Sequence, residues 1–183
     1  MLTPQPSLGP ALRRWRVLNR VKQLHAAELL GVAQSTISRW ESGTQTMELA
    51  QRARVEALVG ARLTSAGDAA LARLVAQHGR GVHLMCDHSH RLLALSPVRS
   101  AEWGCDADDL MGKSLWPFIT EDLARIEDGL ERLGWFDLAC PPAVEAETRA
   151  NGSDLVPIRA SRCRLTRMLL SDGTAARLVE TLR

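Results

Sequence analysis

Residues 34–39 combine side chains that have the chemistry needed to read base pairs. The polar members supply short hydrogen-bond donors and acceptors and one guanidinium; they are Gln34, Ser35, Thr36, Ser38 and Arg39. Groups of this kind bond to base edges in the major groove of DNA. Ile37 and Trp40 lie among them at helical spacing, so a helix over 34–42 would turn these two inward and leave the polar side chains exposed.

The preceding residues predict the element that holds this helix. Residues 23–30 carry apolar side chains at helical spacing and stop at Gly31, a residue that accepts positive φ without steric cost. Val32 is an apolar side chain in the turn, and the small Ala27 lets two helices cross closely. The sequence therefore predicts two short helices around a tight turn.

The stretch from Leu12 to about Leu58 resembles the Cro/CI-type (XRE, lambda-repressor-like) helix-turn-helix family. The matching residues are Arg16, Gln23, Ala27, Gly31, Val32, Gln34, Ile37, Trp40, Glu41 and Gly43. The resemblance implies that 34–42 is the recognition helix and that its N-terminal end enters the major groove. The implied DNA contacts are Gln23 with a phosphate at a helix N-terminus, Gln34, Ser35, Thr36 and Arg39 with bases, Ser38 on the same face, and Thr44 to Thr46, including Gln45, with the backbone.

The same resemblance implies a structural role for two charged residues. Arg16 and Glu41 would pair with each other beneath the recognition helix and act as scaffold. Some positions depart from the family pattern: Lys22 stands where Ser or Thr usually caps the helix, and Leu24 and Leu29 occupy positions that are normally polar. These leucines would be covered by another part of the chain or by a partner subunit.

Composition indicates a globular protein with an asymmetric charge. Hydrophobic residues make up 45% and charged residues 24% of 183 residues. Residues 1–64 hold nine Lys or Arg against four Asp or Glu, whereas the remainder is mildly acidic; a basic module favours phosphate contact. The four cysteines are widely spaced, which predicts reduced thiols. With no apolar run long enough for a bilayer and no export signal, we expect a cytoplasmic protein without membrane contact.

The chain divides into four predicted segments. Residues 1–10 read as a loose arm, and 11–63 as an all-helical DNA-binding domain whose first helix covers 11–21. Residues 64–79 contain an amphipathic helix, which is either a linker or a dimer contact. Residues 80–183 form the second domain.

In the second domain the hydrophobic period changes, which predicts strands at both ends. Residues 82–87 and 91–96 read as a hairpin, followed by short helices, an amphipathic helix over 121–133, and strands over 143–150, 155–169 and 174–182. This order resembles the PAS fold, as do the segments DHSHRLLALS, AEWGCDADDLMGKSLWPFI and NGSDLVPIRAS. The expected fold class is therefore multidomain: an α domain, then an α+β PAS-like domain with about five antiparallel strands and flanking helices.

The second domain gives few signs of bound chemistry. His83, Cys86, His88 and His90 are metal-ligand types, but strand alternation sends His83 to the face opposite Cys86, so no metal site is predicted. The helix that would present a haem ligand in PAS relatives lacks histidine, and Cys105 lacks the setting of a photoactive flavin site. The cofactor stays unknown. By analogy with the family, Trp103 and Trp116 would line a ligand cavity.

These observations favour a dimeric, sequence-specific transcriptional regulator over an enzyme, since no catalytic constellation stands out. The expected partners are an operator in double-stranded DNA, a second copy of the chain, and a small molecule or protein at the PAS-like domain. Two alternatives stay open. In one, the PAS-like domain docks a protein partner and the chain is an adaptor. In the other, a ligand gates DNA binding by shifting a conformational equilibrium.

Overall fold

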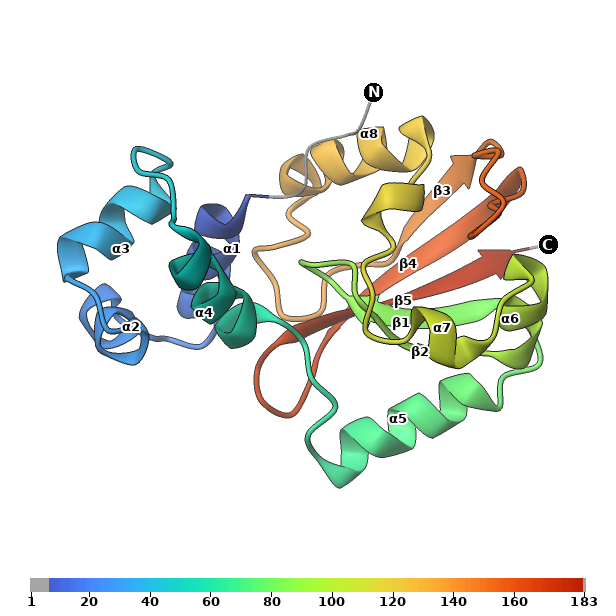
Figure 1. Cartoon of the computed structure of the whole chain (residues 1–183), viewed down its shortest axis with the longest axis horizontal. Helices are drawn as coiled ribbons and strands as arrows, with labels where there is room; N and C mark the ends of the chain where they lie inside the picture. Colours follow the sequence, from blue (N-terminus) through green and yellow to red (C-terminus); the bar gives the residue numbers. More distant parts are fainter. Residues whose placement is uncertain (1–6, 183) are drawn as a thin grey trace.

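The computed structural model describes residues 7–182, which form two domains side by side (Figure 1). The N-terminal domain contains the helices α1 (Leu8–Leu18), α2 (Gln23–Leu30), α3 (Gln34–Glu41) and α4 (Leu49–Val59). A short connection leads to α5 (Ala66–Ala76) and the C-terminal domain. Its elements are β1 (Val82–Cys86), β2 (Leu92–Leu95), α6 (Pro97–Trp103), α7 (Ala107–Leu110), η1 (Trp116–Phe118), α8 (Glu121–Leu130), η2 (Glu131–Leu133), β3 (Val144–Thr148), β4 (Ser161–Leu169) and β5 (Ala175–Leu182).

The N-terminal helices pack around one apolar core. Its buried side chains are Leu8, Leu12, Ala27, Leu30, Ile37, Trp40, Val55 and Val59. The turn between α2 and α3 has the predicted chemistry, because Gly31 adopts the left-handed conformation with φ 66°. The backbone N–H of Val32 then donates to the carbonyl of Ala27 at 3.0 Å and closes the end of α2.

The first helix lies three residues earlier than predicted. Residues 8–10, expected in a loose arm, form the first turn of α1, because Leu8 is part of the core. The helix ends at Leu18 rather than Val21. Arg20 takes a left-handed φ of 55°, and the N–H of Val21 donates back to the carbonyl of Arg16 at 2.8 Å.

The helix between the domains packs on the sheet. Ser65 and Asp68 form a capping box that starts α5, with each side chain accepting from the other residue's backbone N–H. Val75 and Leu71 of α5 contact the same cluster as Val82 and Leu84 of β1. Two members of the predicted apolar stripe, Leu71 and Val75, therefore pack within the chain, whereas Leu74 is 67% exposed.

The sheet is antiparallel throughout, with strand order β2-β1-β5-β4-β3. The predicted architecture of about five antiparallel strands with flanking helices is confirmed. The chain first forms the β1–β2 hairpin, then places α6, α7, η1 and α8 over one face, and returns with β3, β4 and β5 (Figure 1).

One strand is shorter than predicted. β4 begins at Ser161, whereas the pattern placed a strand from Leu155. The reason is Asn151, whose side chain donates to the carbonyls of Phe118 at 2.8 Å and Val156 at 2.9 Å and accepts from the N–H of Ile158 at 2.9 Å. These bonds hold residues 151–158 in a closed loop instead of an extended strand.

Strand alternation on β1 separates two cores. Val82, Leu84 and Cys86 face α5, whereas His83 and Met85 face the helices α6 to α8. The second face borders a cavity, described below. None of the helices in residues 7–182 is both long and apolar enough to cross a membrane.

The two domains meet through α1. Figure 1 shows α1 and α4 between the C-terminal domain and the pair α2 and α3. The Arg14 guanidinium lies 3.7 Å from the centre of the Phe136 ring, and the Asn19 side chain donates to the carbonyl of Gly173 at 3.2 Å. The helices α2 and α3 are therefore on the side remote from the sheet.

Candidate functional site

The outer face of α3 is polar and accessible. We call it the reading face; it consists of Gln34, Ser35, Thr36, Ser38 and Arg39. Thr36 is half-buried and the other four are exposed, while Ile37 and Trp40 lie in the core as predicted. Among residues 7–182, Arg39 has no carboxylate within ion-pair distance, and its nearest side-chain partner is the Thr36 hydroxyl at 3.5 Å. The Arg39 guanidinium is thus available to a ligand outside the protein.

Beneath the reading face lies a buried ion pair. Arg16 donates to both carboxylate oxygens of Glu41, with Nε–Oε1 at 2.8 Å and Nη2–Oε2 at 2.9 Å. This bidentate geometry is the strongest form of such a pair. Burial disfavours the ionised carboxylate, but the bonds from Arg16 and Gln23 outweigh burial and lower the pKa of Glu41. Glu41 therefore ties α1 to the end of α3.

Gln23, predicted to hold a phosphate, has an additional structural contact. Its Nε2 donates to Glu41 Oε2 at 2.9 Å, so its side chain belongs to the same cluster as Arg16. The backbone N–H groups at the start of α2 remain uncapped by a side chain, because Lys22 forms no capping bond. The position thus combines a free helix N-terminus with a glutamine whose side chain is held in place.

The loop after α3 folds back on the helix. Gly43 has a φ of 71°, and the N–H of Thr44 donates to the carbonyl of Arg39 at 2.9 Å. The Thr44 hydroxyl contacts the Ser42 hydroxyl at 3.0 Å, and Gln45 is half-buried. The loop thereby places Thr44 and Gln45 beside the C-terminal end of the reading face.

The C-terminal domain contains a cavity of about 100 Å³, open to solvent on one side, between the sheet and the helices α6 to α8. We call it the inner cavity. Trp103 and Trp116, the two tryptophans expected at a ligand site, both contribute to its wall. Trp103 packs against His83, with 5.1 Å between ring centres, and Trp116 packs against His90 at 4.7 Å. The inner cavity therefore has an aromatic–imidazole pair toward each end of β1.

Comparison with known proteins identifies the N-terminal part. Residues 12–52 match the family model described as Helix-turn-helix. The N-terminal domain is a helix-turn-helix domain. A comparison with curated protein sequences finds no match.

Solved structures of PAS domains are similar to this chain. The PAS domain of an HTR-like protein from Haloarcula marismortui is 21% identical, with a TM-score of 0.43 over 63% of this chain and 90% of that one. The PAS domain of nitrogen regulation protein NR(II) from Vibrio parahaemolyticus is 14% identical, with a TM-score of 0.45 over 66% and 99%. The PAS domain of BvgS from Bordetella pertussis is 15% identical, with a TM-score of 0.44 over 64% of this chain and 86% of that one. The feature that makes the C-terminal domain PAS-like is its antiparallel sheet with the strand order β2-β1-β5-β4-β3.

A buried charge cluster lies between the inner cavity and the helix-turn-helix domain. Asp87, whose side chain is only 3% exposed, accepts from Arg167 Nε and Arg177 Nε at 2.8 Å each and from the Trp135 indole at 3.1 Å. Arg177 also pairs with Glu127. Burial opposes ionisation of Asp87, but the two guanidinium groups and their hydrogen bonds outweigh it and lower its pKa to about 2.

Sequence reasoning missed this cluster, although a signal was present. Arg167 continues the inward alternation of Cys163 and Leu165 on β4, and Arg177 alternates inward with Val179 on β5. A charged residue at an inward strand position requires a partner of opposite charge. The partner, Asp87, is 80 residues before Arg167, so only the folded sheet identifies it.

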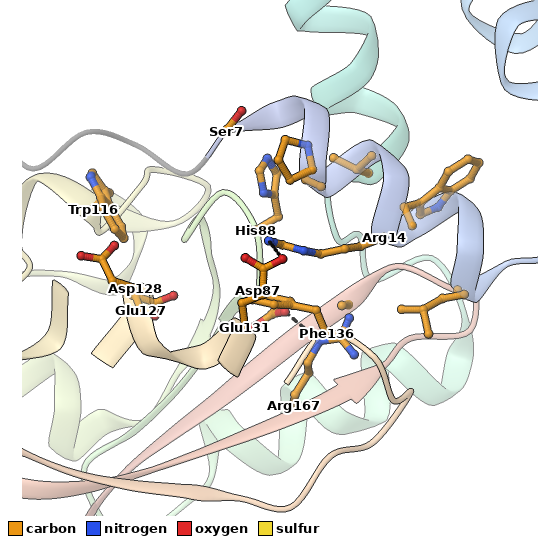
Figure 2. A pocket seen from close by; sticks show the side chains of 17 residues that line it. Ser7, Arg14, Asp87, His88, Trp116, Glu127, Asp128, Glu131, Phe136 and Arg167 are labelled. Atoms are coloured by element: carbon orange, nitrogen blue, oxygen red, sulfur yellow. Dashed lines mark hydrogen bonds and ion pairs between the residues drawn. The ribbon is translucent and has the colours of Figure 1, made fainter. Parts of the chain in front are cut away.

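A second cavity, of about 280 Å³, lies between α1 and the C-terminal domain. Figure 2 shows Arg14 reaching from α1 to lie beside His88 and Asp87 in this interdomain cavity. Burial, with a smaller effect of nearby positive charge, lowers the pKa of His88 to about 4. Trp116 and Glu127 line both cavities, so the two are separated by a shared wall.

The residues weighed as metal ligands do not converge. His83 and His90 face the inner cavity, His88 faces the interdomain cavity, and Cys86 accepts from the N–H of Ala61 at 3.3 Å on the opposite face of β1. In the described part of the chain, no three His, Cys, Asp or Glu side chains are grouped as metal ligands. Ser96 caps α6 by accepting from the N–H of Arg99 and also accepts from the N–H of Val82, each at 3.1 Å.

Proposed function

We propose that this protein is a sequence-specific transcriptional regulator that binds operator DNA as a homodimer. The observation that carries the proposal is the reading face, a polar helix surface supported by the Arg16–Glu41 pair and free of intramolecular ion pairs at Arg39. In this proposal α3 enters the major groove, Gln34, Ser35, Thr36 and Arg39 contact bases, Ser38 lies on the same face, and Gln23, Thr44 and Gln45 contact the DNA backbone.

The arrangement of the domains supports access to DNA. The C-terminal domain contacts α1, on the side of the helix-turn-helix domain away from α2 and α3 (Figure 1). A duplex can therefore approach the reading face without separating the domains. Two copies would place their recognition helices about one helical turn apart, roughly 34 Å, on a two-fold symmetric site.

The C-terminal domain is proposed to sense a signal and to support dimerisation. Trp116 and Glu127 line both the inner and the interdomain cavity, so a ligand that moves them in the inner cavity would also change the surface on which α1 lies. A ligand that binds one docked arrangement better than another would shift the population between DNA-competent and incompetent states. The location is proposed to be the cytoplasm, and the role is regulatory rather than catalytic.

Arg39→Ala tests the assignment. We expect specific binding to weaken by about 1–3 kcal/mol with relaxed preference at one base pair, because the guanidinium can make a bidentate contact with guanine. The measurement is a salt-dependent titration of the full chain against its own upstream region and a scrambled duplex.

Arg52→Ala is the matched control. It removes one guanidinium from α4, where Arg52 pairs with Glu56 at 3.5 Å, away from the reading face. If the Arg39 variant keeps the wild-type ratio of specific to scrambled binding, Arg39 is not a base reader. Weak and equal binding of the wild type to both duplexes would mean that the upstream region holds no operator for this protein, and it would favour the second candidate.

The second candidate is a protein-interaction adaptor. It is favoured by Leu24 and Leu29 of α2, which are 57% and 53% exposed in the chain as it stands. A Leu24→Ser, Leu29→Ser variant distinguishes the two functions. If the chain is an adaptor, the wild type forms a stoichiometric complex with a protein partner, and the variant loses that complex but keeps its affinity for DNA. If it is a regulator whose leucines merely face solvent, the wild type forms no such complex and the variant binds DNA as the wild type does.

A further inference from the structure

The buried polar atoms without partners are concentrated at the inner cavity. In residues 7–182 the buried side-chain nitrogens lacking any close polar partner are Trp40 Nε1, His83 Nδ1, His90 Nδ1 and Arg99 Nε, whereas His90 Nε2 contacts Glu127. Apart from Trp40, each belongs to a residue that lines this cavity. Buried polar groups are nearly always bonded, so a group of exceptions around one cavity indicates a missing polar occupant.

The electrostatics differ between the two ends of the cavity. At one end Arg177 and Arg167 share Asp87, Arg177 also pairs with Glu127, and His90 Nε2 lies 3.4 Å from Glu127 Oε1. At the other end the one carboxylate that pairs with Arg99 within residues 7–182 is that of Glu102, at 2.9 Å, and its side chain is one-third exposed. The guanidinium near this end therefore depends on a carboxylate that is partly exposed to solvent, whereas the carboxylates at the other end are largely buried.

The pKa of His83 is lowered by burial and by the charges around this cavity. Burial, together with the positive charges of Arg99 and Arg177, lowers its pKa well below the ordinary value, so the ring is neutral at pH 7. A neutral imidazole can still donate one hydrogen bond. Arg99 is held in place because its Nη2 donates to the carbonyl of Gly81 and to Thr181 Oγ1, each at 2.7 Å. Its Nε remains without an acceptor.

Size limits the occupant. A cavity of 150 Å³ in another protein binds the six carbon atoms of benzene, so about 100 Å³ accommodates roughly four or five non-hydrogen atoms. Much of the wall is apolar and includes Met85, Ile158 and Leu165. A small anion with a short hydrocarbon body fits these surroundings better than a fully polar anion does.

We propose that the inner cavity binds a short-chain monocarboxylate, with the carboxylate at Arg99 and His83 and the hydrocarbon body against Met85 and Leu165. The proposal rests on the proposed sensing role of the C-terminal domain and specifies the chemical class of its ligand. Arg99 Nε and a ring N–H of His83 would donate to the carboxylate oxygens. The bound anion would supply the acceptor that Arg99 Nε lacks and a buried carboxylate partner for the guanidinium.

The test uses the full chain without DNA and compares sodium propionate with propionamide by calorimetry and thermal unfolding. Propionamide has the same shape without the charge. We expect saturable binding of propionate and about 10- to 100-fold weaker binding of propionamide, since the lost interactions are hydrogen bonds to a charged group. Hexanoate should bind more weakly than propionate because its chain exceeds the cavity.

Two variants and a control locate the site. Arg99→Gln should weaken propionate binding by about tenfold or more, whereas Arg91→Gln, at an exposed arginine of the same domain, should leave it unchanged. His83→Phe keeps the ring shape and removes a buried unpaired nitrogen. It should therefore raise the unfolding temperature without ligand and weaken propionate binding. This variant tests the site even if Arg99→Gln fails to fold.

Equal binding of propionate and propionamide would overturn the proposal. The absence of saturable propionate binding would overturn it too, and would mean that ordered water bonds to the unpartnered nitrogens of His83, His90 and Arg99. Unchanged affinity in His83→Phe would also overturn it. None of these results bears on the DNA titration, so failure of the ligand assignment is distinguishable from failure of the proposed regulator.

Discussion

At the scale of single residues, buried carboxylates hold each domain. Glu41 accepts from Arg16 and Gln23, and its side chain is 5% exposed. We expect Glu41→Gln to lower the free energy of unfolding of the helix-turn-helix domain by about 1–3 kcal/mol, because Arg16 loses a charged partner in a largely buried position. Urea unfolding followed by the NMR signal of the Trp40 indole measures the change.

Glu28→Gln is the control for that comparison. Glu28 contacts His25 at 3.2 Å on the exposed side of α2, and exposed pairs contribute little to stability. A loss in the Glu41 variant no larger than in the Glu28 variant would contradict the role of Glu41 as the tie between α1 and α3.

The lowered pKa of Asp87 predicts that the stability of the C-terminal domain depends on pH. Its pKa falls from the ordinary 3.8 to about 2 in the folded protein, so in that interval the unfolded chain binds more protons than the folded chain. Stability from this group is therefore fully present above pH 4 and is lost as the pH falls through about 2. The expected loss is about 2 kcal/mol.

Urea unfolding between pH 5 and pH 2 measures this contribution. Asp87→Asn should be less stable at pH 7 by about 3–5 kcal/mol, because Arg167 and Arg177 lose their shared anion, and its stability should vary less with pH in the acid range. An equally steep acid loss in Asp87→Asn and in the wild type would assign the titration to other carboxylates.

At the scale of elements, the early start of α1 depends on a close helix crossing. A Cβ at Gly9 would lie 2.0 Å from the backbone carbonyl oxygen of Trp40, a contact that no side-chain movement can relieve. We expect Gly9→Ala to destabilise the helix-turn-helix domain by about 3 kcal/mol, despite the higher helix propensity of alanine.

Gly79→Ala provides the comparison, because a Cβ there meets nothing within 4 Å. It should change the stability of the chain by no more than about 0.5 kcal/mol. Thermal unfolding of the two variants side by side tests the crossing, and equal stability would show that α1 can move away from α3 without cost.

The β1–β2 hairpin places its three histidines in two different cavities. His83 faces the inner cavity because of strand alternation, and His90 reaches the other end of the same cavity from the turn. His90 has a left-handed φ of 55°, a conformation in which histidine is enriched among non-glycine residues. The turn also sends His88 to the interdomain cavity, which is why the histidines form no common site.

At the scale of the whole molecule, Arg14 and Asn19 supply polar contacts between α1 and the C-terminal domain. Arg14 stacks on Phe136, and its pair with Glu131, at 3.9 Å, is exposed on the Glu131 side. We expect Arg14→Ala to loosen the docking while both domains stay folded, since neither core includes Arg14. Hydrogen exchange at Gly173, whose turn receives Asn19, should become faster.

Arg13→Ala is the matched control because Arg13 is the exposed neighbour on the same helix. It should leave exchange at Gly173 unchanged. Slow exchange in both variants would mean that Asn19 and the apolar part of the interface are enough to hold α1, and a rise in both would indicate a general effect of charge.

Short-range chemistry explains what could be predicted. The helix-turn-helix was predictable because Gly31, Ala27 and the apolar spacing of two short helices all act within a few residues. The order of strands and helices in the C-terminal domain followed from the change of hydrophobic period. The errors occurred at boundaries, where Leu8 joined a distant core and Asn151 closed a loop.

The sequence by itself determined which segments are helix or strand and which polar side chains α3 exposes, because turn residues and hydrophobic periodicity act locally. The tertiary structure decided which charged and polar groups share a site. Asp87 meets Arg167 and Arg177 from 80 and 90 residues away, and Arg99 shares a cavity with His83 only after α6 covers the sheet. Contacts between residues so far apart in the sequence depend on strand order and register, which no local sequence pattern specifies.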